Sequence, residues 1–180
     1  FSADSEKLIE ISNAAVEGGM EKKDIDELLQ IVIDQAASER VRIKELVDCF
    51  MNICVNGDEQ EYESHVRKLL REGRAPVPEL LKHMEEEHEA KRKGVLDALG
   101  RIGDKSPSVA NSVRLMLGDR HPQVRAQAAK AIAMLAGPGT ASELMEALQK
   151  RLGEHSDGYA YALGYLGDPK AVPVLTAFVE

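Results

Sequence analysis

The sequence predicts an all-α protein made of antiparallel helix pairs stacked in a row, and three observations support this prediction. A seven-residue phrase occurs three times, at steps of 33 and 31 residues: Ala98-Leu-Gly-Arg-Ile-Gly-Asp104, Ala131-Ile-Ala-Met-Leu-Ala-Gly137 and Ala162-Leu-Gly-Tyr-Leu-Gly-Asp168. A second set of apolar positions keeps steps of 33, 31 and 31 residues: Leu80, Val113, Leu144 and Leu175. The third observation is a composition rich in Ala and Leu. A fixed period in this range is typical of stacked repeats, because one helix pair cannot bury its apolar side alone.

Composition and cysteine content indicate a globular helical chain. Its 180 residues are 43% hydrophobic and 30% charged, which argues against disorder, and 4% aromatic without Trp, which disfavours a β-sandwich. No apolar run approaches the ~18–20 residues of a membrane span, and the polar, acidic start carries no secretory signal. Cys49 and Cys54 are five residues apart in an expected helix, so they lie on different faces and are poor disulfide partners. We therefore expect reduced thiols in a cytoplasmic protein with no membrane partner.

The net charge of −8 is unevenly distributed along the chain. Residues 1–75 hold 10 Lys and Arg against 17 Asp and Glu, a net charge of −7. Residues 76–180 hold 13 against 14, a net charge of −1. Binding to a phosphate backbone needs clustered positive charge, so we expect no nucleic-acid partner.

Four helices are expected in the first, acidic half, over about 2–16, 24–37, 39–54 and 62–70. Gly18-Gly19 ends the first of them, and Asn56-Gly57-Asp58 combines a stop, a turn and a new helix cap. The segment Arg74-Ala-Pro-Val-Pro78 then breaks helical structure and marks a soft boundary. We expect 1–75 to be an irregular helical half that continues or caps the stack, and 76–180 to hold regular repeats in one continuous domain.

Helix pairs are expected from the breaker onward: 78–86 with 89–102, 108–117 with 122–136, 140–152 with 155–166, and a final unpaired helix over 169–179. Two to five residues join these helices, so neighbours must be roughly antiparallel. Asp168-Pro169 supplies an N-cap followed by Pro at the first helical position. Gly100, Ala133 and Gly164 occupy equivalent places in the second helices, which predicts tight contact there.

The second copy of the motif reads Asp-x-x-x-x-Val-Arg-x-x-Ala-Ala from Asp119 to Ala129, and the phrase Ala-Leu-Gly-x-Ile-Gly-Asp occurs in the neighbouring pairs. Together they resemble the HEAT-repeat family, in particular the short repeats of phycobilisome lyase subunits. The resemblance covers residues 76–180, about three and a half repeats. It implies a right-handed α-solenoid whose second helices line the concave side. Such repeats occur in lyases, scaffolds, transport factors and DNA-repair proteins, so the resemblance says little about function.

Arg92 and Arg125 occupy the same repeat position, and Glu86 and Asp119 precede them by six residues. The resemblance implies a ladder of Asp–Arg contacts between repeats, and the alternative is a basic stripe that binds a partner. Ser156 and Lys150 stand at these places in the third repeat, so neither role is expected to run the full length.

Catalytic and metal-binding motifs are weak in this sequence. His88-Glu89 resembles the iron-binding His-Glu pairs of the deoxyhypusine hydroxylase family, but that family places the pair directly after Val-Arg. The equivalent places in the three repeats hold Lys93-Gly94, Ala126-Gln127 and Asp157-Gly158 here, so we expect helix capping by His88, no metal and no cofactor. Neither a Gly-x-Ser-x-Gly turn nor a phosphate-binding Gly motif after a strand is present. Catalytic Ser/His/Asp or Cys/His groupings stay open, because such residues can come from distant segments.

We therefore predict a non-catalytic protein-interaction or scaffold module that binds a protein or peptide on its second helices. The candidate contact residues are Arg92, Lys93, Arg125, Lys130, Tyr161 and Tyr165. Tyr161 and Tyr165 are four residues apart and share a helix face. The acidic run Glu85–Glu89 is either a solvated surface or a docking spot for a basic partner.

Two alternatives are weighed against this prediction. The resemblance to lyase subunits implies a subunit that handles a bilin chromophore. A DNA-binding protein similar to the alkylpurine glycosylases would have a basic, Trp-lined groove, which an acidic chain without Trp does not match.

Overall fold

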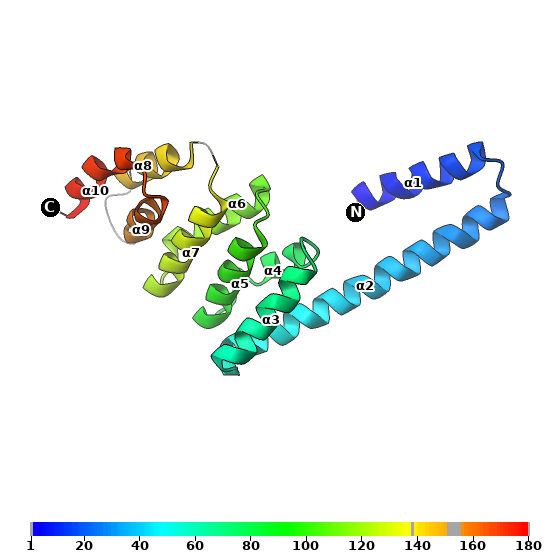
Figure 1. The fold of residues 1–180 in the computed structure, drawn as a ribbon, viewed down its shortest axis with the longest axis horizontal. Coiled ribbons are helices and arrows are strands. Elements are labelled where there is room, and N and C mark those ends of the chain that lie inside the picture. The colour runs from blue at the N-terminus through cyan, green and yellow to red at the C-terminus, as the bar shows by residue number, and fades with distance from the viewer. Residues whose placement is uncertain (1, 138, 151–155, 180) are drawn as a thin grey trace. The chain divides into compact units, whose positions relative to one another are not determined.

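The computed structural model describes residues 2–137, 139–150 and 156–179, and every regular element among them is a helix (Figure 1). The chain divides into two compact units, one up to Lys44 and one from Glu45 onward. No helix within the described ranges combines the length and the apolar character that a membrane crossing requires.

The first unit consists of α1 (Ser2–Glu17) and the beginning of α2 (Lys22–Asn56). Gly19 lies between them with a φ of 82°, which a residue with a side chain rarely adopts. The prediction of two helices over 24–37 and 39–54 is wrong, because α2 is continuous. No Gly or Pro interrupts it, and the hydroxyl of Ser38 donates to the carbonyl of Asp34 within the helix, so this polar residue does not end it.

The second unit begins with the end of α2 and continues with α3 (Glu59–Arg71) and α4 (Val77–Lys82). The elements that follow are α5 (Glu89–Ile102), α6 (Pro107–Leu115), the 3₁₀ turn η1 (Met116–Gly118), α7 (Pro122–Leu135), α8 (Thr140–Lys150), α9 (Asp157–Leu166), the 3₁₀ turn η2 (Pro169–Ala171) and α10 (Val172–Val179). The predicted pairs are confirmed as α4 with α5, α6 with α7 and α8 with α9. The predicted ends at Leu152 and His155 lie outside the described residues.

The repeated phrase marks the ends of second helices. Gly103 and Gly167 follow α5 and α9 with φ values of 73° and 64°, and each donates its backbone N–H back into the helix it ends. Two predicted caps are also confirmed. Asp58 accepts from the backbone N–H of Glu61 at the start of α3, and Asp168 accepts from that of Lys170 at the start of η2.

A single apolar core runs through the second unit, from Val47 in α2 to Ala171 in η2. The second helices α5, α7 and α9 follow one another along the ribbon (Figure 1). The register positions in the first helices are buried against them: Leu80, Val113 and Leu144. Leu175 packs on the same core but is only partly buried, because no second helix follows α10 among the described residues. The stacking expected from the period is therefore confirmed.

Close helix approaches explain some of the glycines in this stack. A Cβ at Gly100 would lie 3.2 Å from Ala131 Cα of α7, so the tight contact predicted there is confirmed. The same prediction for Gly164 is wrong, because a Cβ at that place would have no atom within 4 Å. A Cβ at Gly158, at the start of α9, would overlap the carbonyl oxygen of Leu117.

Gly158→Ala is expected to lower the free energy of unfolding by about 1–3 kcal/mol, because the added methyl group overlaps backbone that cannot move as a side chain can. Gly164→Ala in the same helix is the matched control. It adds a methyl group in open space and should be neutral or stabilising by up to ~1 kcal/mol. Urea unfolding of both variants measures the difference, and equal effects would contradict the packing described for α9.

Candidate functional site

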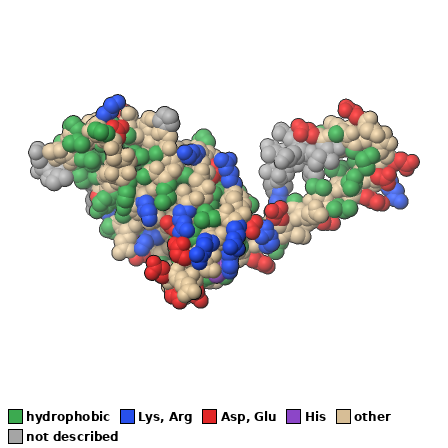
Figure 2. Space-filling view, in the orientation of Figure 1, with side chains coloured by type: hydrophobic (Ala, Val, Ile, Leu, Met, Phe, Trp, Pro, Cys, Tyr) green, Lys and Arg blue, Asp and Glu red, His purple; other side chains and the backbone are tan. Residues whose placement is uncertain are grey.

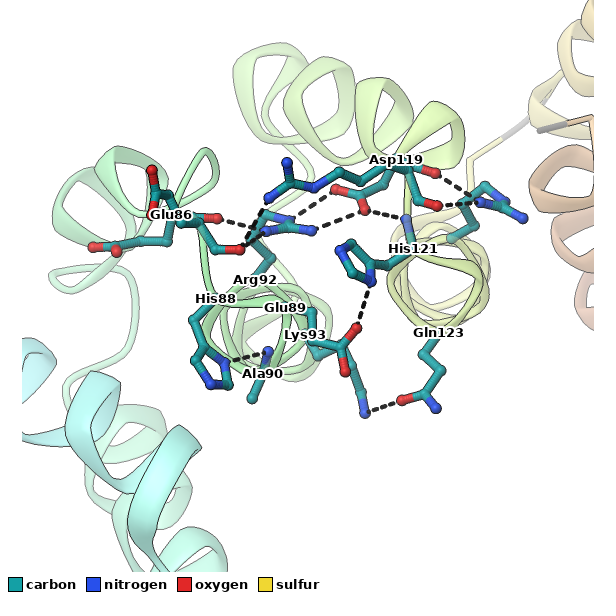
Figure 3. A network of polar contacts seen from close by, with 12 residues as sticks. Glu86, His88, Glu89, Ala90, Arg92, Lys93, Asp119, His121 and Gln123 are labelled. Carbon is teal, nitrogen blue, oxygen red and sulfur yellow. Dashed lines mark hydrogen bonds and ion pairs between the residues drawn. The ribbon is translucent and has the colours of Figure 1, made fainter. Parts of the chain in front are cut away.

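Arg92 of α5 is held between two helix pairs by a set of buried hydrogen bonds (Figure 3). Its Nε and Nη2 donate to the two carboxylate oxygens of Asp119, at 2.8 and 3.0 Å. Its Nη1 donates to the carbonyls of Glu86 and Glu87, at 2.6 and 2.8 Å. The guanidinium group thus joins α5 to the turn before α7 and to its own preceding turn.

Arg125 of α7 repeats this arrangement toward α9. Its Nε and Nη2 donate to Asp157, at 2.6 and 2.7 Å, and its Nη1 donates to the carbonyls of Asp119 and Arg120. Neither role was expected to run the full length, because Lys150 and Ser156 stand at the register positions of the third repeat, yet this repeat supplies an acceptor. Asp157, the first residue of α9, supplies the carboxylate from a position that the repeat register does not align with Asp119.

These two Arg–Asp pairs, here called the ladder, have a structural role: they join successive helix pairs. Arg92 and Arg125 are only 4% and 6% exposed. Burial acts to raise the pKa of Asp119, but hydrogen bonds from Arg92 and from the backbone N–H of His121, together with their charges, outweigh it and bring the pKa below its usual range. Of the two interpretations of these arginines, the structure supports the ladder.

The histidines near the ladder cap and brace helices. His88 Nδ1 accepts from the backbone N–H of Ala90 at 3.2 Å and so caps α5, as predicted (Figure 3). His121 Nδ1 lies 2.7 Å from the carboxylate of Glu89. Among the residues that the structure describes, no three His, Cys, Asp or Glu side chains are grouped so that they could hold a metal ion.

The face formed by the second helices presents two rows of repeat-equivalent side chains. The first row is Asp97, Lys130 and Tyr161, and the second is Arg101, Met134 and Tyr165. Lys130 is exposed, and Met134, Tyr161 and Tyr165 are 42%, 49% and 57% exposed. Figure 2 shows Lys and Arg side chains over α3, α5 and α7, with hydrophobic side chains among and beside them. Asp97 and Met134 were not among the predicted site residues, although the register that aligns them with Lys130 and Tyr165 could have identified them.

A pocket of about 320 Å³ lies on this face near the start of α5. It is lined by Cys54, Glu59, Tyr62, Glu63, Ala90, Lys93, Gly94, Asp97 and Gln127. Asp97 accepts from the Tyr62 hydroxyl at 3.0 Å and from Gln127 Nε2 at 3.2 Å, and Lys93 Nζ donates to Gln123 at 3.1 Å. The polar groups of the pocket are thus largely engaged with one another.

The thiol of Cys54 and the phenol of Tyr62, which line this pocket, both have raised pKa values. Burial and the nearby charge of Asp97 raise the pKa of Cys54 to about 12. The same two causes, with a hydrogen bond to Asp97, raise the pKa of Tyr62 above its usual range. Both groups stay protonated, so neither is poised to attack a substrate.

The structure also brings together a Cys–His contact that the sequence left open. Cys49 Sγ of α2 lies 3.5 Å from His65 Nε2 of α3. His65 Nδ1 lies 3.0 Å from the carbonyl of Glu61, which can only accept, so Nδ1 carries the proton and Nε2 is the acceptor. Cys49 is exposed and His65 is half-buried.

Comparison with known proteins gave one family match. The family model described as HEAT repeats matches residues 77–156 and, in a second overlapping placement, residues 113–180. No match was found among curated proteins or among solved structures.

Arg92→Ala is expected to lower the free energy of unfolding by about 3–5 kcal/mol, because it leaves the carboxylate of Asp119 buried without its cation. Lys93→Ala, at the adjacent and more exposed position, is the control and should cost about 0.5 kcal/mol or less. Urea unfolding of the two variants measures the contrast. A loss below about 1 kcal/mol for Arg92→Ala would argue against the ladder as a structural element.

Iodoacetamide is expected to alkylate Cys49 before Cys54 in the folded chain at pH 8. Cys49 is exposed, whereas Cys54 is partly buried and has a pKa near 12, which leaves little thiolate. Peptide mass spectrometry at successive times measures both rates, and the urea-unfolded chain is the control in which they should converge. Faster labelling of Cys54 in the folded chain would contradict the structure of this region.

Proposed function

Because the chain belongs to the HEAT-repeat family, we propose that it is a non-catalytic interaction or scaffold module whose second helices bind a partner protein. HEAT repeats generally mediate protein–protein interaction or scaffolding, and the family is typically non-enzymatic. The observation that carries the proposal is the pair of exposed rings of Tyr161 and Tyr165, one turn apart on one face of α9, here called the aromatic patch. Large exposed apolar side chains grouped on one helix face are characteristic of interaction surfaces.

The six candidate contact residues take different parts in this proposal. Tyr161, Tyr165 and Lys130 would contact the partner directly, since their side chains are exposed. Lys93 borders the pocket and would contact the partner at the edge of the surface. Arg92 and Arg125 act indirectly, by holding the second helices at the spacing that brings the rows together.

We also propose that residues 1–75 continue or cap the stack formed by 76–180. The boundary between the two compact units lies after Lys44 along the chain. A cytoplasmic location and the absence of a nucleic-acid partner stay predictions. Nothing in the described residues favours bilin handling or DNA binding over the interaction surface.

Selection of a random-peptide display library on the full chain tests the proposal. We expect enriched peptides whose binding is lost with the double variant Tyr161→Ala, Tyr165→Ala, because aromatic anchors carry much of the affinity at such surfaces. Leu115→Ala is the matched control, since Leu115 is 73% exposed but lies on the first helix α6. The absence of enriched peptides, or equal losses with both variants, would contradict the proposed surface.

A further inference from the structure

We propose that the partner segment seated on α7 and α9 carries a carboxylate directly beside an apolar side chain. This inference rests on the proposed function and adds the chemistry of the partner. The surface that would receive this segment consists of the aromatic patch and the ammonium group of Lys130.

The aromatic patch offers a place for one apolar side chain. Tyr161 and Tyr165 are one turn apart on α9 and share a helix face. Gly164 lies to one side of this face, and a Cβ there would have no heavy atom within 4 Å, so the helix surface next to the rings is open. Met134 of α7 occupies the repeat position of Tyr165, but its Sδ lies only 3.0 Å from the place of a Cβ at Gly100, so its thioether is turned toward α5. An apolar side chain placed on the aromatic patch would be in contact with the two rings.

Lys130 supplies the charge next to this place. It is four residues before Met134, on the same side of α7, and it occupies the repeat position of Tyr161. Its ammonium group makes no ion pair or side-chain hydrogen bond with any residue that the structure describes. A cation bordered by exposed apolar side chains is complementary to a carboxylate beside an apolar group.

The neighbouring charges do not satisfy Lys130, because they are engaged elsewhere. Asp97, at the equivalent position of α5, accepts from Tyr62 and Gln127. Arg101, one turn later, donates to both carboxylate oxygens of Glu63, at 2.8 and 3.1 Å. Asp97 and Arg101 of α5 are thus paired within the fold, whereas the ammonium group of Lys130 on α7 is available to a ligand.

A basic partner is the competing occupant, since the chain is acidic overall and carries the run Glu85–Glu89. That run lies in the turn before α5 and not beside the aromatic patch. Two of its carboxylates are already in contact with cationic or imidazole groups, Glu86 with Lys91 and His83, and Glu89 with His121. The surface around Tyr161 and Tyr165 therefore favours an acidic segment.

The test uses the peptides recovered by display on the full chain, together with a parallel selection on Lys130→Glu. We expect the wild-type chain to enrich peptides with Asp or Glu next to an apolar residue, and the variant to lose this preference. A recovered peptide is then synthesised with its acid and with the matching amide, and both are titrated by fluorescence anisotropy. The amide should bind roughly two- to fivefold more weakly to the wild-type chain, and equally well to Lys130→Gln.

The outcomes separate this inference from the function on which it rests. Peptides that depend on Tyr161 and Tyr165 but show no acidic preference, or a basic one, would overturn the inference and leave the interaction surface standing. An amide effect that persists in Lys130→Gln would likewise overturn it, because the carboxylate would then contact another group. Recovery of no peptides that depend on the two tyrosines would remove the proposed function and the inference together.

Discussion

Each helix pair in this chain can bury its apolar side only against the next pair, and the rest of the second unit follows from that dependence. The second helices α5, α7 and α9 must approach closely, so small residues stand where they meet, as Gly100 does against Ala131. The first helices then bury one apolar residue per repeat behind them, at Leu80, Val113 and Leu144. A continuous core results without any single large hydrophobic element.

The ladder is the polar counterpart of this stacking. A buried guanidinium group is tolerated only when its donors are satisfied, and Arg92 and Arg125 each meet a carboxylate of the next repeat and carbonyls of their own preceding turn. Such an arrangement disfavours any other register between pairs, because a shift would leave charges buried and unpaired. The ladder therefore helps to hold the second helices in the one alignment that keeps repeat-equivalent residues such as Lys130 and Tyr161 in register.

The two rows of outward side chains on α5, α7 and α9 consist of positions that neither the apolar core nor the ladder uses. On α5 the outward charges pair with α3 through Arg101 and Glu63, so that end of the face is internally satisfied. On α7 and α9 the equivalent positions hold Lys130, Met134 and the two tyrosines, which are all exposed, although the Sδ of Met134 packs toward Gly100 of α5. The same repeat positions thus carry paired charges on α5 and exposed apolar side chains on α9. This gradient follows from side-chain identity at equivalent positions and not from a change in the backbone.

The sequence by itself determined the repeat, because buried small and apolar residues must recur at the helix-pair period, and it located the caps at Asp58, His88 and Asp168. The ladder and the two alternatives for Arg92 and Arg125 were also visible in it, but only burial in the folded chain could choose between them. The continuation of α2 past Ser38 has a local cause, since the Ser38 hydroxyl donates to the carbonyl of Asp34 in the same helix. Tertiary structure decided two further points: Asp157 supplies the carboxylate that meets Arg125, and Gly164 has no neighbour where Gly100 does. The physical reason is that local propensity and spacing are properties of one segment, whereas burial and pairing depend on what another segment places opposite it.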